Sequence, residues 1–481
     1  MPKKVTLADY FVDHLSSMNG VLEVETGIEK SYAQIYENAL SLAAGLELKK
    51  GDRLTVLLPN SCNWIEYFIA SMIGGWIFSP VPYFVQVQEL DKILKYVNPK
   101  AIISDRKDIK QKLGARYNVL KVYENKSSHT NYTRPNIEEN DAAALYYSSG
   151  TTGNPKGVIY SHKNMTSLIA SIIRGFKFTN EDKQLAFLPF GHTASINYNI
   201  LPALMAGSNL FISQGFEQLR KNFFIVLSKH RITYTQIVPT VLLMLNKLSI
   251  RTDFLDLSQL QFIGCGSSTL PFTSQLEFIE KYGVKVANLY GLSETGPSHI
   301  DDPREPGWKP GSIGYPLDVN KCKIAEDGEI LLKGENIFIE YYQNESLYNK
   351  VVIDGWFHTG DLGEKNNKKF YFTDRKKDLI IKGGINIVPM EVEEAIYLHP
   401  FVAECVVVGK FSKIHGEEII AVVVKTDNAP EDVQLNQEIK DYCKKRLSSY
   451  KVPSKVFFWV SLPKTASKKL IRREVREKIN I

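Results

Sequence analysis

The feature of this sequence that most limits its fold is a regular alternation of short apolar runs with longer helix-like stretches. Stretches with helical periodicity, for example 163–176 and 273–283, lie between apolar runs that have strand length and end at turn residues. These runs are 53–59 (RLTVLLP), 101–105 (AIISD), 143–149 (AALYYSS), 183–189 (KQLAFLP) and 261–266 (QFIGCG). Strands that alternate with helices predict an α/β fold with a largely parallel sheet, covered on both faces, that binds ligands at the carboxyl ends of its strands.

A different pattern begins after Gly328, where short apolar runs are separated by turns and charge-rich pieces. The segment 374–378 (DRKKD) places five consecutive charged residues between two apolar runs, so it is not expected inside a core. A chain of 481 residues is also too long for one ordinary core. We therefore predict a large N-terminal domain, residues 1–376, of stacked αβ layers with mixed sheets, and a small α+β C-terminal domain, residues 377–481.

Several classes of protein do not fit this composition. The N-terminal sequence MPKKVTLADYFVDHL lacks the apolar run and small-residue cleavage site of a signal peptide. The most apolar stretch, 64–84, is interrupted by Glu66, a glycine pair and two prolines, which favours a buried helix and strand over a membrane span. The five cysteines are scattered without a CxxC pair, so neither a disulfide framework nor a zinc site is indicated. We expect a cytoplasmic protein with no membrane span and no nucleic-acid partner.

The net charge of +6 is unevenly distributed along the chain. Residues 440–481 hold thirteen Lys or Arg and only three acidic residues. Such a basic surface is either a solvated face of a small domain or a site for an acidic or phosphorylated partner.

The segment 147–157 reads YSSGTTGNPKG and has almost no apolar surface to bury. Its glycines let backbone N–H groups approach an anion, its hydroxyls are short donors, and its lysine supplies a mobile positive charge. The spacing is not that of a Walker A motif. A loop of this kind predicts a site for the outer phosphates of a triphosphate, with an exposed turn as the alternative. The predicted phosphate-binding residues are Ser148, Ser149, Gly150, Thr151, Thr152, Gly153 and Lys156.

Further motifs follow this loop in a fixed order. They are LPFGH (188–192), NLYGLSETG (288–296), HTGDL (358–362), YFTDRKKDLIIKGGINIVPMEVE (371–393), YKVP (450–453) and PKTASKKL (463–470). With this series the sequence resembles the adenylate-forming superfamily, which includes acyl-CoA synthetases, aryl-CoA ligases, firefly luciferase and nonribosomal adenylation domains. The resemblance extends over most of the chain and is strongest to an acyl- or aryl-CoA ligase.

The resemblance implies a site for ATP and Mg²⁺. Tyr290 and the strand end at 264–266 would enclose adenine, which needs an aromatic face on one side and bare backbone on the other. Glu294 would hold Mg²⁺, a hard cation that prefers oxygen ligands. The remaining nucleotide-binding residues that it implies are Gly264, Gly266, Asn288, Gly291, Ser293 at the α-phosphate, and Asp361 and Arg375 at the ribose.

The resemblance also implies a pocket for the acid, with an entrance that includes Phe190 and Tyr198. Its predicted residues are His192, Thr193, Ile196, Gly264, Cys265 and Gly291. His192 is either a gate on the substrate side or a structural residue. Amino-acid-activating relatives place an Asp where Thr193 stands, and a buried ammonium without a carboxylate is costly. We therefore expect a carboxylic acid that has no α-amino group.

The C-terminal motifs imply a moving part. Lys469 resembles the lysine that bridges the carboxylate and the α-phosphate during adenylation. Lys468 stands where Gly is usual, so it remains the alternative. Lys377 corresponds to the hinge residue of similar enzymes, and Gly383 and Gly384 would line a channel for coenzyme A. The expected catalytic residues are therefore Lys469, Glu294, Lys156 and His192.

Together these residues imply an enzyme that activates an acid with ATP, releases pyrophosphate, and transfers the acyl group from acyl-AMP to coenzyme A. One alternative acceptor is the phosphopantetheine of an acidic carrier protein. Another alternative is a non-enzymatic nucleotide-binding homologue, although the retained charged groups at 156, 294, 361, 375 and 469 count against it.

Overall fold

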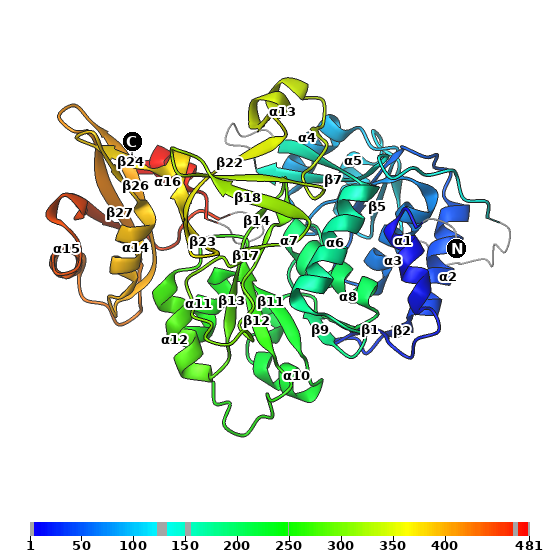
Figure 1. The fold of residues 1–481 in the computed structure, drawn as a ribbon, viewed down its shortest axis with the longest axis horizontal. Coiled ribbons are helices and arrows are strands. Elements are labelled where there is room, and N and C mark those ends of the chain that lie inside the picture. The colour runs from blue at the N-terminus through cyan, green and yellow to red at the C-terminus, as the bar shows by residue number, and fades with distance from the viewer. Residues whose placement is uncertain (1–3, 123–131, 150–154, 249, 465–469, 480–481) are drawn as a thin grey trace.

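Two seven-stranded sheets form the frame of the molecule, seen at the centre and right of Figure 1. The computed structural model describes residues 4–122, 132–149, 155–248, 250–464 and 470–479. In sheet order, the first sheet consists of β13 (Val286–Leu289), β12 (Phe262–Gly266), β11 (Tyr234–Ile237), β9 (Lys183–Ala186), β10 (Asn209–Ile212), β1 (Gly20–Glu23) and β2 (Glu29–Ser31). The second consists of β20 (Glu340–Tyr341), β8 (Pro155–Ser161), β7 (Ala142–Ser149), β4 (Ile77–Pro80), β3 (Arg53–Leu57), β5 (Ala101–Ser104) and β6 (Val119–Leu120).

Helices fill the space between the two sheets and cover their outer faces. The shared core lies between the sheets and includes side chains of α2 (Tyr32–Gly45), α3 (Cys62–Gly74), α6 (His162–Phe176) and α8 (Leu201–Ala206). The outer face of the first sheet packs on α10 (Phe223–Lys229), α11 (Pro239–Lys247) and α12 (Phe272–Tyr282). The outer face of the second packs on α4 (Val87–Val97) and α5 (Lys107–Leu113). The predicted fold of stacked αβ layers is confirmed.

The apolar runs of the sequence became strands, and the most apolar stretch became a buried helix and a strand. α3 begins where the Ser61 hydroxyl accepts a hydrogen bond from the Trp64 N–H, and it ends at Gly75, whose φ is 67°. Its side chains are almost entirely buried between the sheets. No helix among the described residues is long and apolar enough to cross a bilayer.

The sheets are mixed rather than wholly parallel. Most neighbouring strands run parallel, for example β11 with β9 and with β12. Antiparallel pairs occur between β1 and β2, between β7 and β8, and between β8 and β20. The parallel strands of the first sheet therefore present their carboxyl ends together at one edge, where β11, β12 and β13 end.

A smaller sheet follows these layers and leads to a separate C-terminal sheet. The smaller sheet contains β18 (Asn320–Ile324), β19 (Glu329–Gly334), β22 (Trp356–Asn366), β21 (Val352–Ile353) and β23 (Lys369–Arg375). The C-terminal sheet contains β25 (Ile385–Ile387), β24 (Ile380–Lys382), β27 (Gly416–Lys425), β26 (Val402–Ser412) and β28 (Lys455–Phe458). Its helices are α14 (Pro389–Tyr397), α15 (Asp432–Lys444) and α16 (Arg472–Ile479).

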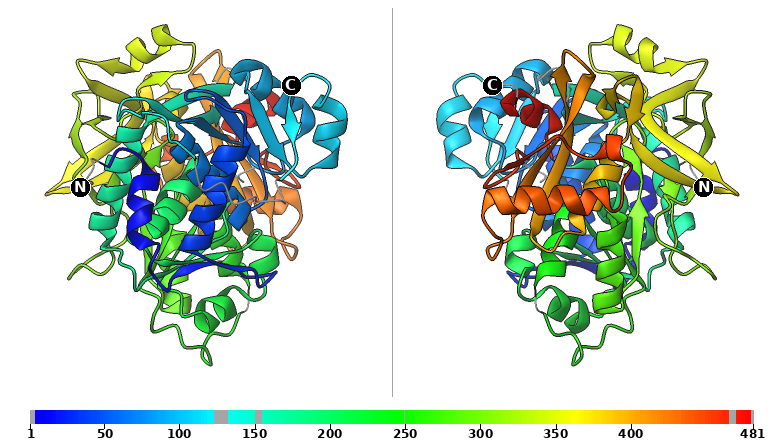
Figure 2. Two further views of the ribbon diagram at one scale, coloured as in Figure 1. Left: turned by 90° about the vertical axis from the view of Figure 1, so that its right-hand side faces the viewer. Right: turned by 90° about the vertical axis from the view of Figure 1, so that its left-hand side faces the viewer.

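This C-terminal sheet has apolar cores of its own on its two faces. In the right-hand view of Figure 2 it faces the reader in orange, with α16 in red. A small C-terminal unit beside the larger layers agrees with the predicted fold class, while the boundary between residues 376 and 377 remains a prediction.

The charged segment 374–378 departs from expectation. It spans the end of β23 and the 3-10 turn η3 (Lys376–Asp378), and its two acids are buried, with exposures of 3% for Asp374 and 7% for Asp378. The Asp374 carboxylate accepts hydrogen bonds from the backbone N–H groups of Arg375 and Met390, at 2.7 and 3.1 Å. The expectation that this segment stays outside a core is therefore wrong for the two acids, because each has partners that offset its desolvation.

Candidate active site

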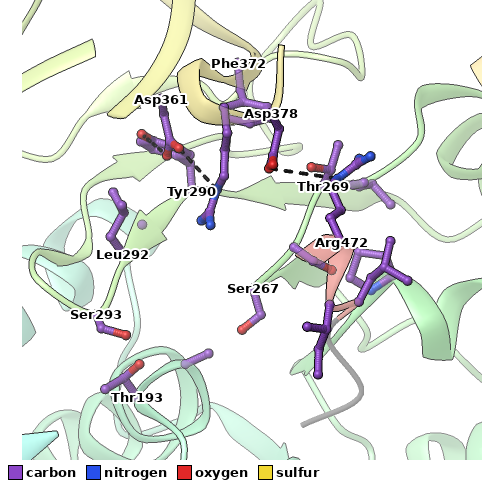
Figure 3. A pocket seen from close by; sticks show the side chains of 18 of the residues that line it. Thr193, Ser267, Thr269, Tyr290, Leu292, Ser293, Asp361, Phe372, Asp378 and Arg472 are labelled. Carbon is purple, nitrogen blue, oxygen red and sulfur yellow. Dashed lines mark hydrogen bonds and ion pairs between the residues drawn. The ribbon is translucent and has the colours of Figure 1, made fainter. Parts of the chain in front are cut away.

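A cavity of about 1810 Å³ lies at the carboxyl ends of β11, β12 and β13, against the C-terminal unit. Its walls come from segments far apart in the sequence, since Pro239 follows β11, Ser267 follows β12, and Arg472 begins α16. Figure 3 shows Tyr290 and Asp361 on one side of this space and Arg472 with Asp378 on another. The position agrees with the rule that ligands of open α/β sheets bind at the carboxyl ends of strands.

Many of the residues predicted from sequence meet in this cavity. Those that line it are Lys156, His192, Thr193, Asn288, Tyr290, Gly291, Ser293, Glu294, Asp361, Arg375 and Lys377. Others lie elsewhere in the described part of the chain and are not among the lining residues, namely Ile196, Gly264, Cys265, Gly266, Gly383 and Gly384. Ser148 and Ser149 end strand β7. Gly150, Thr151, Thr152, Gly153 and Lys469, with its alternative Lys468, lie outside the described residues.

Tyr290, Asp361 and Arg375 form one connected group. The Tyr290 hydroxyl donates to Asp361 Oδ2 at 2.9 Å, and Arg375 Nε lies 3.4 Å from Asp361 Oδ1. Burial, followed by the neighbouring Asp361 carboxylate, raises the pKa of Tyr290 well above its usual value, so this hydroxyl stays protonated and donates. The strand pair β22 and β23 places Asp361 directly opposite Arg375. The group can therefore present a carboxylate and a guanidinium together to the hydroxyls of a ribose.

Contacts with neighbouring side chains hold Tyr290 in place. The ring makes an edge contact with His299, with centroids 5.4 Å apart. Burial lowers the pKa of His299 to about 3, so its imidazole is neutral at physiological pH. The Tyr290 carbonyl accepts a hydrogen bond from the Tyr198 hydroxyl at 3.1 Å. The aromatic face is thus held in place before any ligand arrives.

Glu294 and Lys156 stand near each other on the same side of the cavity. The Tyr341 hydroxyl donates to Glu294 Oε1 at 2.8 Å, and Lys156 Nζ lies 5.8 Å from the centre of the Tyr341 ring. Burial, followed by the Glu294 carboxylate, raises the pKa of Tyr341, which keeps its hydroxyl a donor. A single carboxylate beside a lysine suits Mg²⁺, which is usually held by one or two carboxylates and by substrate phosphates.

The glycines of β12 have a packing reason that the sequence did not reveal. A Cβ at Gly264 would lie 2.6 Å from Leu289 Cδ1, and one at Gly266 would lie 2.5 Å from the Leu289 carbonyl oxygen. Gly266 is therefore needed beside the backbone of β13, whereas a side chain at Gly264 would require the ends of the Leu289 and Tyr234 side chains to shift. Whether the same backbone also faces adenine stays a prediction.

His192 caps a short helix at the cavity wall. Its Nδ1 accepts a hydrogen bond from the Ala194 N–H at 3.2 Å, at the start of α7 (Thr193–Ser195). The preceding Gly191 packs so closely on the chain at Pro82 that a Cβ would lie 2.2 Å from the Pro82 nitrogen. The capping bond gives His192 a structural function, and its position in the cavity wall leaves the predicted gating function open.

The predicted hinge and channel residues lie on the side of the C-terminal unit. Lys377 lies in η3 and lines the cavity, where desolvation followed by repulsion from Arg375 lowers its pKa. Gly383 and Gly384 form the exposed turn between β24 and β25, with φ values of 59° and 80°. Positive φ at both central positions is typical of a two-residue hairpin turn and explains the glycine pair. Their function in a coenzyme A channel stays a prediction.

Sequence reasoning missed an arginine network beside the predicted hinge. Arg472 binds both carboxylate oxygens of Glu393, at 2.5 and 2.9 Å, and its Nε lies 4.0 Å from Asp378 Oδ2. Arg476 donates to Asp378 Oδ1 at 3.0 Å. The only available signal was the position of Arg472 three residues after Lys469, because its partners lie far away in the sequence.

Comparisons with known proteins agree with this geometry. A family model described as "AMP-binding enzyme" matches residues 14–342, and one described as "AMP-binding enzyme C-terminal domain" matches residues 391–469. The long-chain-fatty-acid–CoA ligase of Bacillus subtilis (strain 168) is 32% identical, over 94% of this chain and 90% of that protein.

Two solved structures share the whole fold. ATP-bound MatB from Rhodopseudomonas palustris has a TM-score of 0.90 at 25% identity and covers 99% of each chain. The o-succinylbenzoate CoA synthetase (MenE) from Bacillus subtilis, in complex with the acyl-adenylate intermediate OSB-AMP, has a TM-score of 0.87 at 26% identity, again over 99% of each chain.

Proposed function

The chain belongs to the AMP-binding enzyme family, and from this premise we propose that it is an AMP-forming acid–CoA ligase. In the first half-reaction the acid's carboxylate attacks the α-phosphate of ATP, which forms acyl-AMP and releases pyrophosphate. In the second, the thiol of coenzyme A attacks the acyl carbon and AMP departs. The relatives supply support, since they include CoA ligases and a structure that holds an acyl-adenylate.

The observation that carries the proposal is the meeting of Tyr290, Asp361 and Arg375 with Glu294 and Lys156 in one cavity. The first three residues would hold the adenosine, because Tyr290 offers an aromatic face and Asp361 accepts from the ribose hydroxyls. Lys156 would pair with the outer phosphates. Glu294 would hold Mg²⁺, which when bound offsets phosphate charge. Catalysis of this kind rests on positioning and charge stabilisation, with no protein nucleophile.

We further propose that the C-terminal unit serves the two half-reactions in two orientations. Lys469 would approach the α-phosphate during adenylation, and rotation about Lys377 would then bring Gly383 and Gly384 toward the thiol path. Supporting this proposal, Lys377 lies between the β22–β23 pair and the C-terminal sheet, at the edge of the cavity. Gly383 and Gly384 are not among the residues that line the cavity in the present orientation.

The acid itself is proposed to lack an α-amino group, because Thr193 offers no carboxylate to an ammonium at the cavity wall. A cytoplasmic location, where ATP and coenzyme A are both present, goes with this proposal.

Exchange of labelled pyrophosphate into ATP, measured across fatty, aromatic and amino acids, tests the function. Acid-dependent exchange is expected, with discrimination of about a hundredfold or more against amino acids. If no acid supports exchange, the chain is a non-enzymatic nucleotide-binding homologue. Turnover with coenzyme A and with a phosphopantetheinylated carrier protein then distinguishes the two acceptors, and a preference for the carrier would replace the ligase assignment.

A further inference from the structure

Four buried, neutral polar side chains carry atoms that have no hydrogen-bond partner in the described part of the chain. Gln184, Gln236, Asn199 and Tyr234 are each at most 1% exposed. The six atoms without a partner among the described residues are both polar atoms of each glutamine amide, Asn199 Nδ2 and the Tyr234 hydroxyl. We call this set the polar layer.

The strand register places three of these residues on one face of the first sheet. Tyr234 pairs with Gln184 across β11 and β9, and Gln236 follows two residues after Tyr234, so all three point the same way. The residues that alternate with them along the strands, such as Leu185 and Ile237, belong to the core on the opposite face. Asn199 comes from the π-helix η2 (Ile196–Ile200), which packs against β9 and β11.

The polar layer adjoins residues that line the cavity, although none of its own four residues is among the lining residues. Tyr198, the neighbour of Asn199, lines the cavity. It also lies close to Tyr234, since burial, followed by the neighbouring Tyr198, raises the pKa of the Tyr234 phenol. Gln236 precedes the cavity-lining Pro239 by three residues, a depth of roughly 10 Å in extended chain. Gly264, the register partner of Gln236, leaves room for the Tyr234 hydroxyl, since a Cβ there would lie 2.7 Å from it.

Unpaired buried polar groups need an explanation, because each one loses its hydrogen bonds to water on folding. An apolar acyl chain would leave all six atoms unsatisfied. A tail with its own donor and acceptor would pair with them, and sites built in this way discriminate strongly against analogues that lack the polar group. Since the four side chains are uncharged, a charged tail would itself be left without a counter-ion in this layer.

We propose that the acid carries an uncharged hydrogen-bonding group, a hydroxyl, keto or amide group, at the end remote from its carboxylate, and that the polar layer binds this group. The proposal rests on the proposed ligase function. The tail would pass Tyr198 and reach Gln236 first, with Gln184, Tyr234 and Asn199 around its end.

Matched acids that differ only in the remote group test the proposal. Pyrophosphate exchange is measured with 3-(4-hydroxyphenyl)propanoate against 3-phenylpropanoate, and with 8-hydroxyoctanoate against octanoate. The hydroxylated member of at least one pair should have a kcat/KM about tenfold higher or more. Gln236→Leu should remove this preference, raise kcat/KM for the apolar member and leave Tm unchanged or higher, because it removes unsatisfied polar atoms.

Two further variants separate recognition from structure. Asn199→Leu should shift selectivity in the same direction as Gln236→Leu. Thr235→Val changes the opposite face of the same strand, where the Thr235 hydroxyl donates to the Leu185 carbonyl at 2.8 Å, so it should lower Tm without changing the ratio within a pair.

The outcomes are distinct. Exchange that is equal within both pairs, or higher for the apolar members, would overturn the polar-tail proposal and leave the ligase function standing. Unchanged selectivity in both Gln236→Leu and Asn199→Leu would also overturn it, because ordered water would then be the partner of the layer. Exchange with no acid at all would overturn the ligase function and this proposal with it.

Discussion

Two sides of the same cavity use carboxylates in different ways. On the side of the predicted nucleotide site, Glu294 has a hydrogen bond to only one of its oxygens among the residues that the structure describes, from Tyr341. On the side of the predicted hinge, Glu393 has both oxygens bound by Arg472, and one of them also accepts from the Val407 N–H. A carboxylate in a cavity is therefore available to a ligand only where the surrounding protein leaves one of its oxygens without a partner. Residue type alone does not show which carboxylates are available.

The two sides of the cavity are also formed by different parts of the molecule. The predicted nucleotide side is built from β22 and β23 of the smaller sheet and from the loop after β13. The hinge side joins η3, α14 and α16, next to the predicted pivot. We expect substitutions on the first side to change binding and substitutions on the second to change domain orientation or stability.

The largest effect is expected from Lys377→Pro. Proline fixes φ near −65°, which suits a 3-10 turn in this orientation but prevents the rotation that a hinge requires. Formation of acyl-AMP should persist, while formation of the thioester from supplied acyl-AMP should be lost. Lys377→Ala removes the same charge without fixing φ and should retain both steps. Normal overall turnover by the proline variant would exclude this hinge.

Lys469→Ala should impair the other half-reaction, the formation of acyl-AMP. Loss of a charge that stabilises the transition state should slow acyl-AMP formation by about a hundredfold or more, as measured by rapid quench. The reaction of supplied acyl-AMP with coenzyme A should survive. Lys468→Ala is the control for register, and an effect confined to that variant would move the assignment by one residue. Equal loss in both half-reactions would contradict a function limited to adenylation.

Arg472→Met should act mainly on stability. It leaves the Glu393 carboxylate buried without its counter-charge, which costs about 3 kcal/mol of unfolding free energy. Chemical denaturation monitored by tryptophan fluorescence measures this effect. Arg473→Met is the matched control, because the Arg473 side chain is 47% exposed and pairs with Glu477 at the surface, where ion pairs contribute little. A similar loss of unfolding free energy in the two variants would show that the buried Arg472–Glu393 pair contributes no more to stability than an exposed ion pair.

Tyr290→Phe should have the smallest effect. It removes the hydroxyl that donates to Asp361 and keeps the aromatic face, so about 1 kcal/mol, or fivefold in the KM for ATP, should be lost. Tyr282→Phe removes a buried hydroxyl that donates to the Leu245 carbonyl, and since neither residue lines the cavity it should leave KM unchanged. If the Tyr290→Phe enzyme has an unaltered KM for ATP, the Tyr290 hydroxyl does not orient Asp361 for ATP binding.

Local sequence gave a reliable account of the layers, and it also placed in recognisable motifs several residues that share the cavity. The apolar runs at 53–59 and 261–266 each became a strand in place, because their length and bounding turns are local properties. Tyr290 and Asp361 lie in recognisable motifs, and they meet as expected in one cavity. The buried acids of 374–378 were misjudged, because burial of a charge depends on partners such as Met390 and Arg476, which the segment itself does not contain.

The sequence by itself determined the α/β class, the order of the motifs and the family, since each depends on periodicity or on residues that are neighbours in the chain. Only the tertiary structure decided that Gly266 is needed beside the Leu289 backbone, that Arg472 neutralises Glu393, and that Gln184 and Gln236 share one face of the first sheet. The physical reason is that hydrogen bonds, ion pairs and steric contacts form between atoms a few ångströms apart. Which distant residues come that close is fixed by strand register and helix packing.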